Sequence, residues 1–284
     1  MGEANTSSAR FSILRRLGEV ALHAAGLTSD EYATLSLLQA RRMVRTSGSR
    51  RDDVLLRSAE DRGNLYPATD LRTRFNLIWL AADDAERART EVDDALERWS
   101  QRGFHLQHYS ALQAMEQRDL YVGDAASASR RLEAQWPALK RSLLTRIQVL
   151  RIEVVQLRGR VALAMATRGV DVKRHRSAAD AKRLEDERMA WAEPHASLLR
   201  SSIAAAKGDD RAAVRCARAA LRGDERADMG LYAATARRRL GELVGGDEGR
   251  ALEKASAAWM TEQGIRRPER MTAMLAPGPW KAIV

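Results

Sequence analysis

The feature that most constrains the fold is a four-residue spacing that recurs along the chain. In each copy an acidic residue is followed by a small residue at the fourth position, an apolar residue at the eighth and a large apolar residue at the twelfth. Residues four apart lie on one face of an α-helix, so each copy predicts a short amphipathic helix that begins at an acidic turn. The copies span Asp84–Leu96, Asp124–Trp136, Asp209–Leu221 and Asp247–Trp259.

The intervals between copies indicate a repeat of helical pairs. The first two copies start 40 residues apart and the last two 38 apart, while the 85 residues between the second and third leave room for one degenerate unit. A period of this length is typical of stacked helical hairpins. We therefore expect an all-α chain of about five antiparallel helical hairpins, a build that usually serves binding.

Three regions follow from this pattern. Residues 1–65 lack the repeat and are predicted to be a disordered start with an irregular helical cap, residues 66–265 carry the repeats, and residues 266–284 form a tail. Pro137 is expected in the first turn of a long apolar helix over residues 139–167. Trp136 and Trp259 are expected in the core between repeats. The tail is predicted to pack over the last hairpin through Met271, Met274 and Leu275.

The composition agrees with a helical fold and limits the choice of partner. Aromatic residues are 5% of the chain, and much of the rest is Ala, Leu, Arg and Glu, which favours helix over strand. The net charge of +10 would permit nucleic-acid binding. However, 38 acidic residues are mixed with the basic ones, and the longest basic runs, residues 173–176 and 237–239, are short. These residues favour a solvated helix face over a nucleic-acid site.

The chain shows no sign of a membrane or secretory destination. Its first ten residues are polar and have no apolar core, which is unlike a secretory signal, and no apolar run approaches the length of a membrane span. The single Cys216 lies in the third amphipathic helix and is expected to be a buried structural residue. These features predict a cytoplasmic protein without a membrane partner.

Few residues have the spacing of a chemical site. His105 and His108 could lie on one helix face, but a metal site needs further ligands, so we expect structural or surface histidines. The aspartate pairs fall at helix starts or on solvated faces, where they complement the helix dipole. The Gly-rich residues 245–249 contain an acidic pair that would repel phosphate, so they predict a turn. The sequence predicts no catalytic, metal-binding or cofactor-binding residue, and hence a protein that is not an enzyme.

If the hairpins stack, their first helices should line a concave groove, which is the default binding surface of such arrays. The residues expected there are Arg74, Asn76, Gln113, Arg158 and Arg239.

Two resemblances add to this prediction. The Gly-Asp-x-x-x-Ala frame resembles the second helix of a tetratricopeptide repeat. The segment starting Trp136-Pro137-Ala138-Leu139, together with Gly245-Gly246-Asp247-Glu248-Gly249 and the residues around each, resembles the C-terminal repeat region of large bacterial eukaryotic-like serine/threonine kinases, chiefly those of myxobacteria. The second resemblance covers about residues 70 to 280. It implies a tetratricopeptide-like right-handed superhelix and a link to kinase signalling.

The chain departs from those kinases in having no kinase domain. The Gly-rich phosphate loop, the strand-borne lysine, the His-Arg-Asp loop and the Asp-Phe-Gly metal site are all missing from the sequence. We therefore expect a non-catalytic interaction or scaffold module that binds a protein or peptide, of acidic character, or a kinase or ATPase domain. The alternatives are nucleic-acid binding through the basic surface, and a small-molecule or enzymatic pocket beneath the helix over residues 139–167.

Overall fold

The computed structural model describes residues 65–167 and 172–280, which belong to one compact unit. Over these two ranges the chain is helical and contains no strand, which confirms the prediction of an all-α protein. The cap predicted for residues 1–65 lies outside the described residues except for Leu65, where the first described helix begins. No helix in the described ranges has the length and apolar character needed to cross a membrane.

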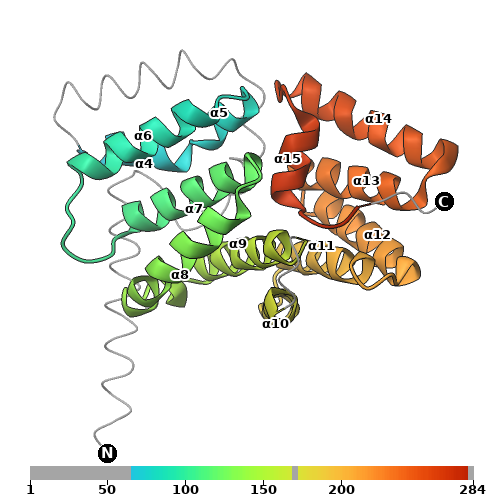
Figure 1. Ribbon diagram of the computed structural model, residues 1–284, viewed down its shortest axis with the longest axis horizontal. Helices are drawn as coiled ribbons and strands as arrows, with labels where there is room; N and C mark the ends of the chain where they lie inside the picture. Colours follow the sequence, from blue (N-terminus) through green and yellow to red (C-terminus); the bar gives the residue numbers. More distant parts are fainter. Residues whose placement is uncertain (1–64, 168–171, 281–284) are drawn as a thin grey trace, which may run out of the picture. The chain divides into compact units, whose positions relative to one another are not determined.

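The helices follow one another through short connections (Figure 1). In chain order they are α4 (Leu65–Arg74), α5 (Leu77–Ala81), α6 (Ala85–Arg98), α7 (Leu106–Tyr121), α8 (Ala125–Arg141), the 3-10 turn η1 (Leu144–Arg146), α9 (Gln148–Ala166), α10 (Val172–Asp186), α11 (Ala192–Ala205), α12 (Asp210–Arg226), α13 (Gly230–Val244), α14 (Gly246–Glu262) and α15 (Pro268–Leu275). Neighbours in the chain pack on each other, most extensively α11 on α12 and α13 on α14, followed equally by α9 on α10 and α12 on α13.

The same turn precedes three of the predicted amphipathic helices. Asp84, Asp124 and Asp209 are the N-caps of α6, α8 and α12, and each carboxylate accepts a hydrogen bond of 2.9–3.0 Å from the backbone N–H three residues later. The residue before each cap has a positive φ, which lets the chain reverse at once. The acidic start of the sequence pattern is therefore a helix cap, because an aspartate oxygen satisfies an N–H that has no partner within the helix.

In the first three copies of the pattern, the residues at the fourth and eighth positions lie in the core as predicted. The small and apolar positions of each copy are buried, whereas the last, large position is only half-buried. The buried pairs are Ala88 and Val92, Ala128 and Leu132, and Ala213 and Ala217, and the half-buried ends are Leu96, Trp136 and Leu221. Trp136 and Trp259, which were expected in the core between repeats, are half-buried.

The register predicted from the fourth copy of the pattern is wrong. Helix α14 begins at Gly246 with Gly245 as its cap at φ 63°, so Ala251 and Ala255 are exposed. The buried positions are instead Gly249, Ser256 and Met260. The reason is a close approach of two backbones: a Cβ on Gly249 would lie 2.5 Å from the carbonyl oxygen of Gly241 on α13.

The long apolar helix starts later than predicted. Helix α8 continues through Pro137 to Arg141, and α9 begins only at Gln148. Pro137 is exposed within α8, and its missing N–H removes one hydrogen bond from the last turns of that helix. The break comes instead at Leu143, which adopts a left-handed conformation at φ 64°. Helix α9 is covered on more than one side, and most of its residues are buried.

The tail forms α15, which packs on α13 and α14 through the buried Met271, Met274 and Leu275. It also contacts α7, which was not predicted. Ahead of α15, the N–H of Arg266 donates to the carbonyl of Ala81 at 2.9 Å, and Arg270 pairs with Asp83 at 3.1 Å. The tail therefore joins the last helices to the first helices of the described chain.

Candidate functional site

Three of the predicted groove residues have partners within the chain. The buried Asn76 donates to the carbonyl of Ala88 at 2.7 Å. Gln113 donates to the hydroxyl of Tyr109 and to the carboxylate of Glu153. Arg74 lies 3.8 Å from Asp70, in an ion pair within α4. These three side chains stabilise contacts between and within helices.

The other two predicted groove residues are buried arginines with different surroundings. Arg239 donates from Nε to the carbonyl of Ala276 at 2.9 Å and from Nη1 to Glu242 at 2.5 Å, so it holds the end of α15 against α13. Arg158 is bound to Asp180 on α10 through Nε and Nη2 and also lines a pocket. Of the five predicted residues, only Arg158 lines this pocket.

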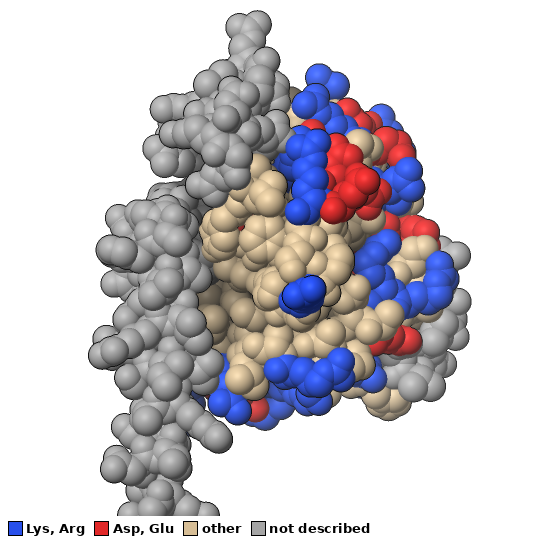
Figure 2. All heavy atoms as spheres, turned by 90° about the vertical axis from the view of Figure 1, so that its left-hand side faces the viewer, with Lys and Arg blue, Asp and Glu red and all other residues tan. Residues whose placement is uncertain are grey.

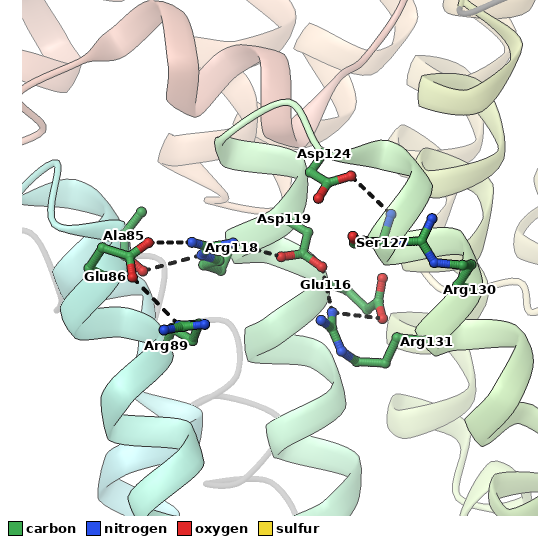
Figure 3. A network of polar contacts seen from close by, with 10 residues as sticks. All are labelled: Ala85, Glu86, Arg89, Glu116, Arg118, Asp119, Asp124, Ser127, Arg130 and Arg131. Carbon is green, nitrogen blue, oxygen red and sulfur yellow. Dashed lines mark hydrogen bonds and ion pairs between the residues drawn. The ribbon is translucent and has the colours of Figure 1, made fainter.

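A network of alternating charges connects α6, α7 and α8 (Figure 3). Arg118 on α7 donates to Glu86 on α6 at 2.5 Å and to the neighbouring Asp119 at 3.2 Å. Asp119 in turn accepts from Arg131 on α8 at 2.6 Å. Because Asp119 is almost fully buried, this chain of ion pairs fixes the three helices relative to one another.

Glu116 is the least satisfied member of this network. Its nearest cation, Arg131 Nη1, is 3.6 Å from Oε1, and neither carboxyl oxygen has a hydrogen-bond partner among the described residues. Burial raises the pKa of Glu116 to about 9, and Asp119 adds to the rise while Arg131 opposes it. The carboxyl group is therefore protonated at neutral pH. It has no exposed surface, so it is a structural acid rather than one that meets a substrate.

A second group of buried titratable residues surrounds α9. Burial lowers the pKa of His195 to about 3, with a smaller effect from Arg160, and its ring lies 4.4 Å from that of Tyr232. Burial also lowers the pKa of Arg160, whose Nη1 reaches the carbonyl of Met274 at 3.4 Å. Asp224 on α12 has a pKa raised by burial. These residues are enclosed, which favours a role in packing over one in chemistry.

The two histidines with metal-like spacing are engaged with neighbouring groups. His105 Nδ1 accepts from the indole of Trp99 at 3.2 Å, and His108 Nδ1 accepts from the backbone N–H of His105 at 3.1 Å. In the described ranges no group of three His, Cys, Asp or Glu side chains is placed to hold a metal ion. Cys216 is half-buried, and burial raises the pKa of its thiol.

Among the residues that the structure describes, the candidate for binding is a pocket of about 180 Å³ between α8, α9 and α10. Its apolar lining comes from Leu132, Val161 and Ala162, together with Trp136 and Pro137. The polar lining residues are Ser129, Glu133, Arg158 and Arg176. The volume suits a single amino-acid side chain and is below the range of about 300–1,000 Å³ usual for small-molecule ligands.

The arginine in this pocket is held rigidly. Arg158 Nε donates to Asp180 Oδ2 at 2.8 Å, and its guanidinium carbon lies 4.1 Å from the centre of the Trp136 ring. A planar guanidinium favours both contacts, because it binds a carboxylate edge-on and stacks on an aromatic face. Arg176 lies one helical turn before Asp180 on the same helix.

Sequence reasoning gave a pocket beneath the helix over residues 139–167 only as an alternative and did not name the residues that line it. Trp136 was expected to be core, and Arg176 was only the end of a short basic run. The signal that could have indicated this pocket lies next to Pro137. The apolar positions of α8 end there at Trp136, which is only half-buried. Comparison of the chain with family models, with curated proteins and with solved structures found no match.

Proposed function

We propose that this protein is a non-catalytic helical-repeat module that binds a protein or peptide partner. The observation that carries the proposal is the pocket between α8, α9 and α10, which has the size of one side chain, an apolar lining and fixed polar groups at its edge. Such a pocket can hold an anchoring side chain of a partner. It is too small to favour the alternative of a small-molecule or enzymatic site beneath α9.

Apolar surface close to this region in the chain supports the same function. Leu143 and Ile147, on either side of η1, are each 39% exposed. Figure 2 shows one face of the molecule on which uncharged surface is bordered by residues of both charges. Exposed apolar side chains such as Leu143 and Ile147 suit the centre of a protein-binding surface.

The finer architectural proposal is a tetratricopeptide-like right-handed superhelix. It is supported by the shared turn at Asp84, Asp124 and Asp209 and by the packing of neighbouring helices in pairs. The proposed link to serine/threonine kinase signalling, with a kinase or ATPase domain as partner in a cytoplasmic setting, is supported by the sequence resemblance alone.

Nucleic-acid binding is the less favoured function. Many described arginines are already paired with acidic side chains, among them Arg118, Arg131, Arg151 and Arg200. The face in Figure 2 carries acidic as well as basic groups. A site that follows a phosphate backbone needs a continuous basic surface.

A photo-crosslinking amino acid at Glu133, an exposed residue of the pocket, tests the proposal in cells that express the full chain. We expect a discrete protein adduct at this position. The same amino acid at the exposed Glu262 on α14 is the control and should give none. Adducts to nucleic acid, or equal labelling from both positions, would count against a protein-binding pocket.

A further inference from the structure

The residues that line the pocket between α8, α9 and α10 limit the kinds of ligand that it can bind. We propose that it binds the side-chain carboxylate of an acidic residue in a partner peptide, with Arg158 and Arg176 as the groups that hold it. This inference rests on the proposed function as a peptide-binding module. It goes further by stating which side chain is bound and how.

The first argument is that Arg158 has a donor nitrogen that its partner Asp180 does not use. Its side chain is only 7% exposed, and Asp180 occupies Nε and Nη2. Nη1 makes no hydrogen bond to any residue in the described ranges, and it is not among the enclosed nitrogens that lack a partner. Arg158 lines the pocket, and in the proposed complex this nitrogen is the donor that meets the carboxylate.

The second argument is preorganisation. Asp180 on one side and the Trp136 ring on the other fix the guanidinium before any ligand arrives. A donor that is already fixed loses little side-chain entropy when it binds. Its hydrogen bond to a carboxylate is charge-assisted, and so stronger than one between neutral groups.

The third argument is the charge at the pocket edge. Asp180 offsets the charge of Arg158, while the exposed Arg176 adds a second cation. Glu133 lies one turn before Trp136 on α8, and its carboxylate accepts from the hydroxyl of Ser129 at 3.1 Å. The carboxylates of Glu133 and Asp180 balance the charges of Arg158 and Arg176, so the second charge of a phosphate gains no net attraction here, whereas a single carboxylate can still accept hydrogen bonds from the arginines.

The fourth argument is the apolar lining. Leu132, Val161 and Ala162 line the pocket together with the donors, and Trp136 adds an aromatic ring. The methylene groups of a glutamate or aspartate side chain would lose water against these residues, while the carboxylate meets the arginines. A volume of about 180 Å³ admits such a side chain.

The test uses the full chain and blocked pentapeptides, with the indole N–H signal of Trp136 as the NMR readout, assigned by Trp136→Phe. We expect Ac-Ala-Ala-Glu-Ala-Ala-NH2 to shift this signal with saturation. The glutamine counterpart should bind about tenfold more weakly, since it lacks the charge. The phosphoserine counterpart should also bind more weakly than the glutamate peptide.

Two variants on α10 separate the pocket from general charge effects. Arg176→Ala should weaken the glutamate peptide about tenfold, whereas Lys182→Ala, which removes an exposed charge outside the pocket, should leave it unchanged. Glu133→Gln should strengthen binding. Equal effects of the two alanine variants, no saturable shift, or equal binding of glutamate and glutamine peptides would overturn the inference.

Failure of this inference can be distinguished from failure of the proposed function. A protein adduct at position 133 without any response to the glutamate peptide would leave a protein-binding pocket but refute its preference for a carboxylate. Sodium acetate that binds as tightly as the peptide would show that a free acid suffices, and this would refute a peptide ligand.

Discussion

The side-chain amide of Asn76 donates a 2.7 Å hydrogen bond to the carbonyl oxygen of Ala88 on α6. Ser201 on α11 donates to the carbonyl of Ala213 on α12 at 2.8 Å, across the same separation of 12 residues. Each bond joins the two members of a packed pair near the turn that connects them. The corresponding position of the α7–α8 pair is Glu116, which is protonated because of its raised pKa. A short polar side chain at this position therefore links the helices of two pairs, whereas Glu116 makes no hydrogen bond to another described residue.

Removing this link should destabilise the pair that contains it. Ser201→Ala deletes one buried hydrogen bond and little volume, so we expect the free energy of unfolding to fall by about 1 kcal/mol. Urea unfolding of the full chain measures the change. Ser197→Ala, at a half-buried position of the same helix, is the matched control and should have a smaller effect. Equal losses in the two variants would remove the special role of Ser201.

Glu116 should make the protein less stable as the solution becomes alkaline. The pKa of Glu116 is about 9 in the folded state, above its ordinary value of 4.5. Between these two pH values the folded state therefore holds a proton that the unfolded state has released. The free energy of unfolding should therefore fall as pH rises from about 4.5 to about 9, by at most about 1.4 kcal/mol per pH unit from this group. Glu116→Gln should flatten that part of the profile measured by denaturant unfolding. A variant with the same slope as the natural chain would contradict the pKa.

His195 should produce the opposite slope in acid. Its folded pKa of about 3 is below the model value of 6.5, so the unfolded state takes up a proton that the folded state excludes. The neutral ring makes its whole contribution to the free energy of unfolding above pH 6.5, and this contribution is lost as the pH falls towards 3. His195→Leu should reduce the rise in stability between these pH values, as followed by circular dichroism at fixed urea. His175→Leu, at an exposed position on α10, should retain the full rise.

The two buried arginines that hold the end of α15 should respond differently to the same substitution. Arg160 makes one long bond to Met274, and its Nε has no partner among the described atoms, so Arg160→Met should be neutral or stabilising. Arg239 has two good bonds, to Ala276 and Glu242, and Arg239→Met should cost about 1–3 kcal/mol. Thermal and urea unfolding of both variants tests the difference. Equal losses would show that the long bond of Arg160 is as stabilising as the short ones.

The register of α14 can be checked with two substitutions on that helix. Met260 is fully buried, and Met260→Ala should cost about 2–5 kcal/mol. Ala255 is exposed, and Ala255→Gln should change stability by no more than about 0.5 kcal/mol. If Ala255→Gln were the more damaging of the two, the register read from the sequence would be right and that of the structure wrong.

The parts of the fold that could be predicted are those fixed by local chemistry. The caps at Asp84, Asp124 and Asp209 were visible because an aspartate before an apolar stripe both ends a turn and starts a helix. The fourth copy failed because its register depends on Gly241 and Gly249, two glycines on different helices that let the backbones meet. Their contact is tertiary, and a four-residue spacing contains no information about it.

The candidate site was harder to predict for the same reason. The pocket exists only because Trp136, Arg158 and Arg176 come from three helices that pack together. Arg158 was expected in a groove on the basis of its type and helix. The sequence could not show that Asp180 and Trp136 would hold it, since no pattern links residues on α8, α9 and α10.

The contact between Asp83 and Arg270 joins positions 187 residues apart. On the ribosome, the helices around Asp83 leave the exit tunnel long before the segment that pairs with them. The early helices must therefore remain without this contact, and with their side of α7 uncovered by α15, until almost all of the described chain has been made. Contacts between such distant residues slow folding, because the closure of a long loop precedes any gain from the contact. During synthesis α15 therefore docks after the helices that it covers, and a truncated product would expose the surface that α15 covers on α7.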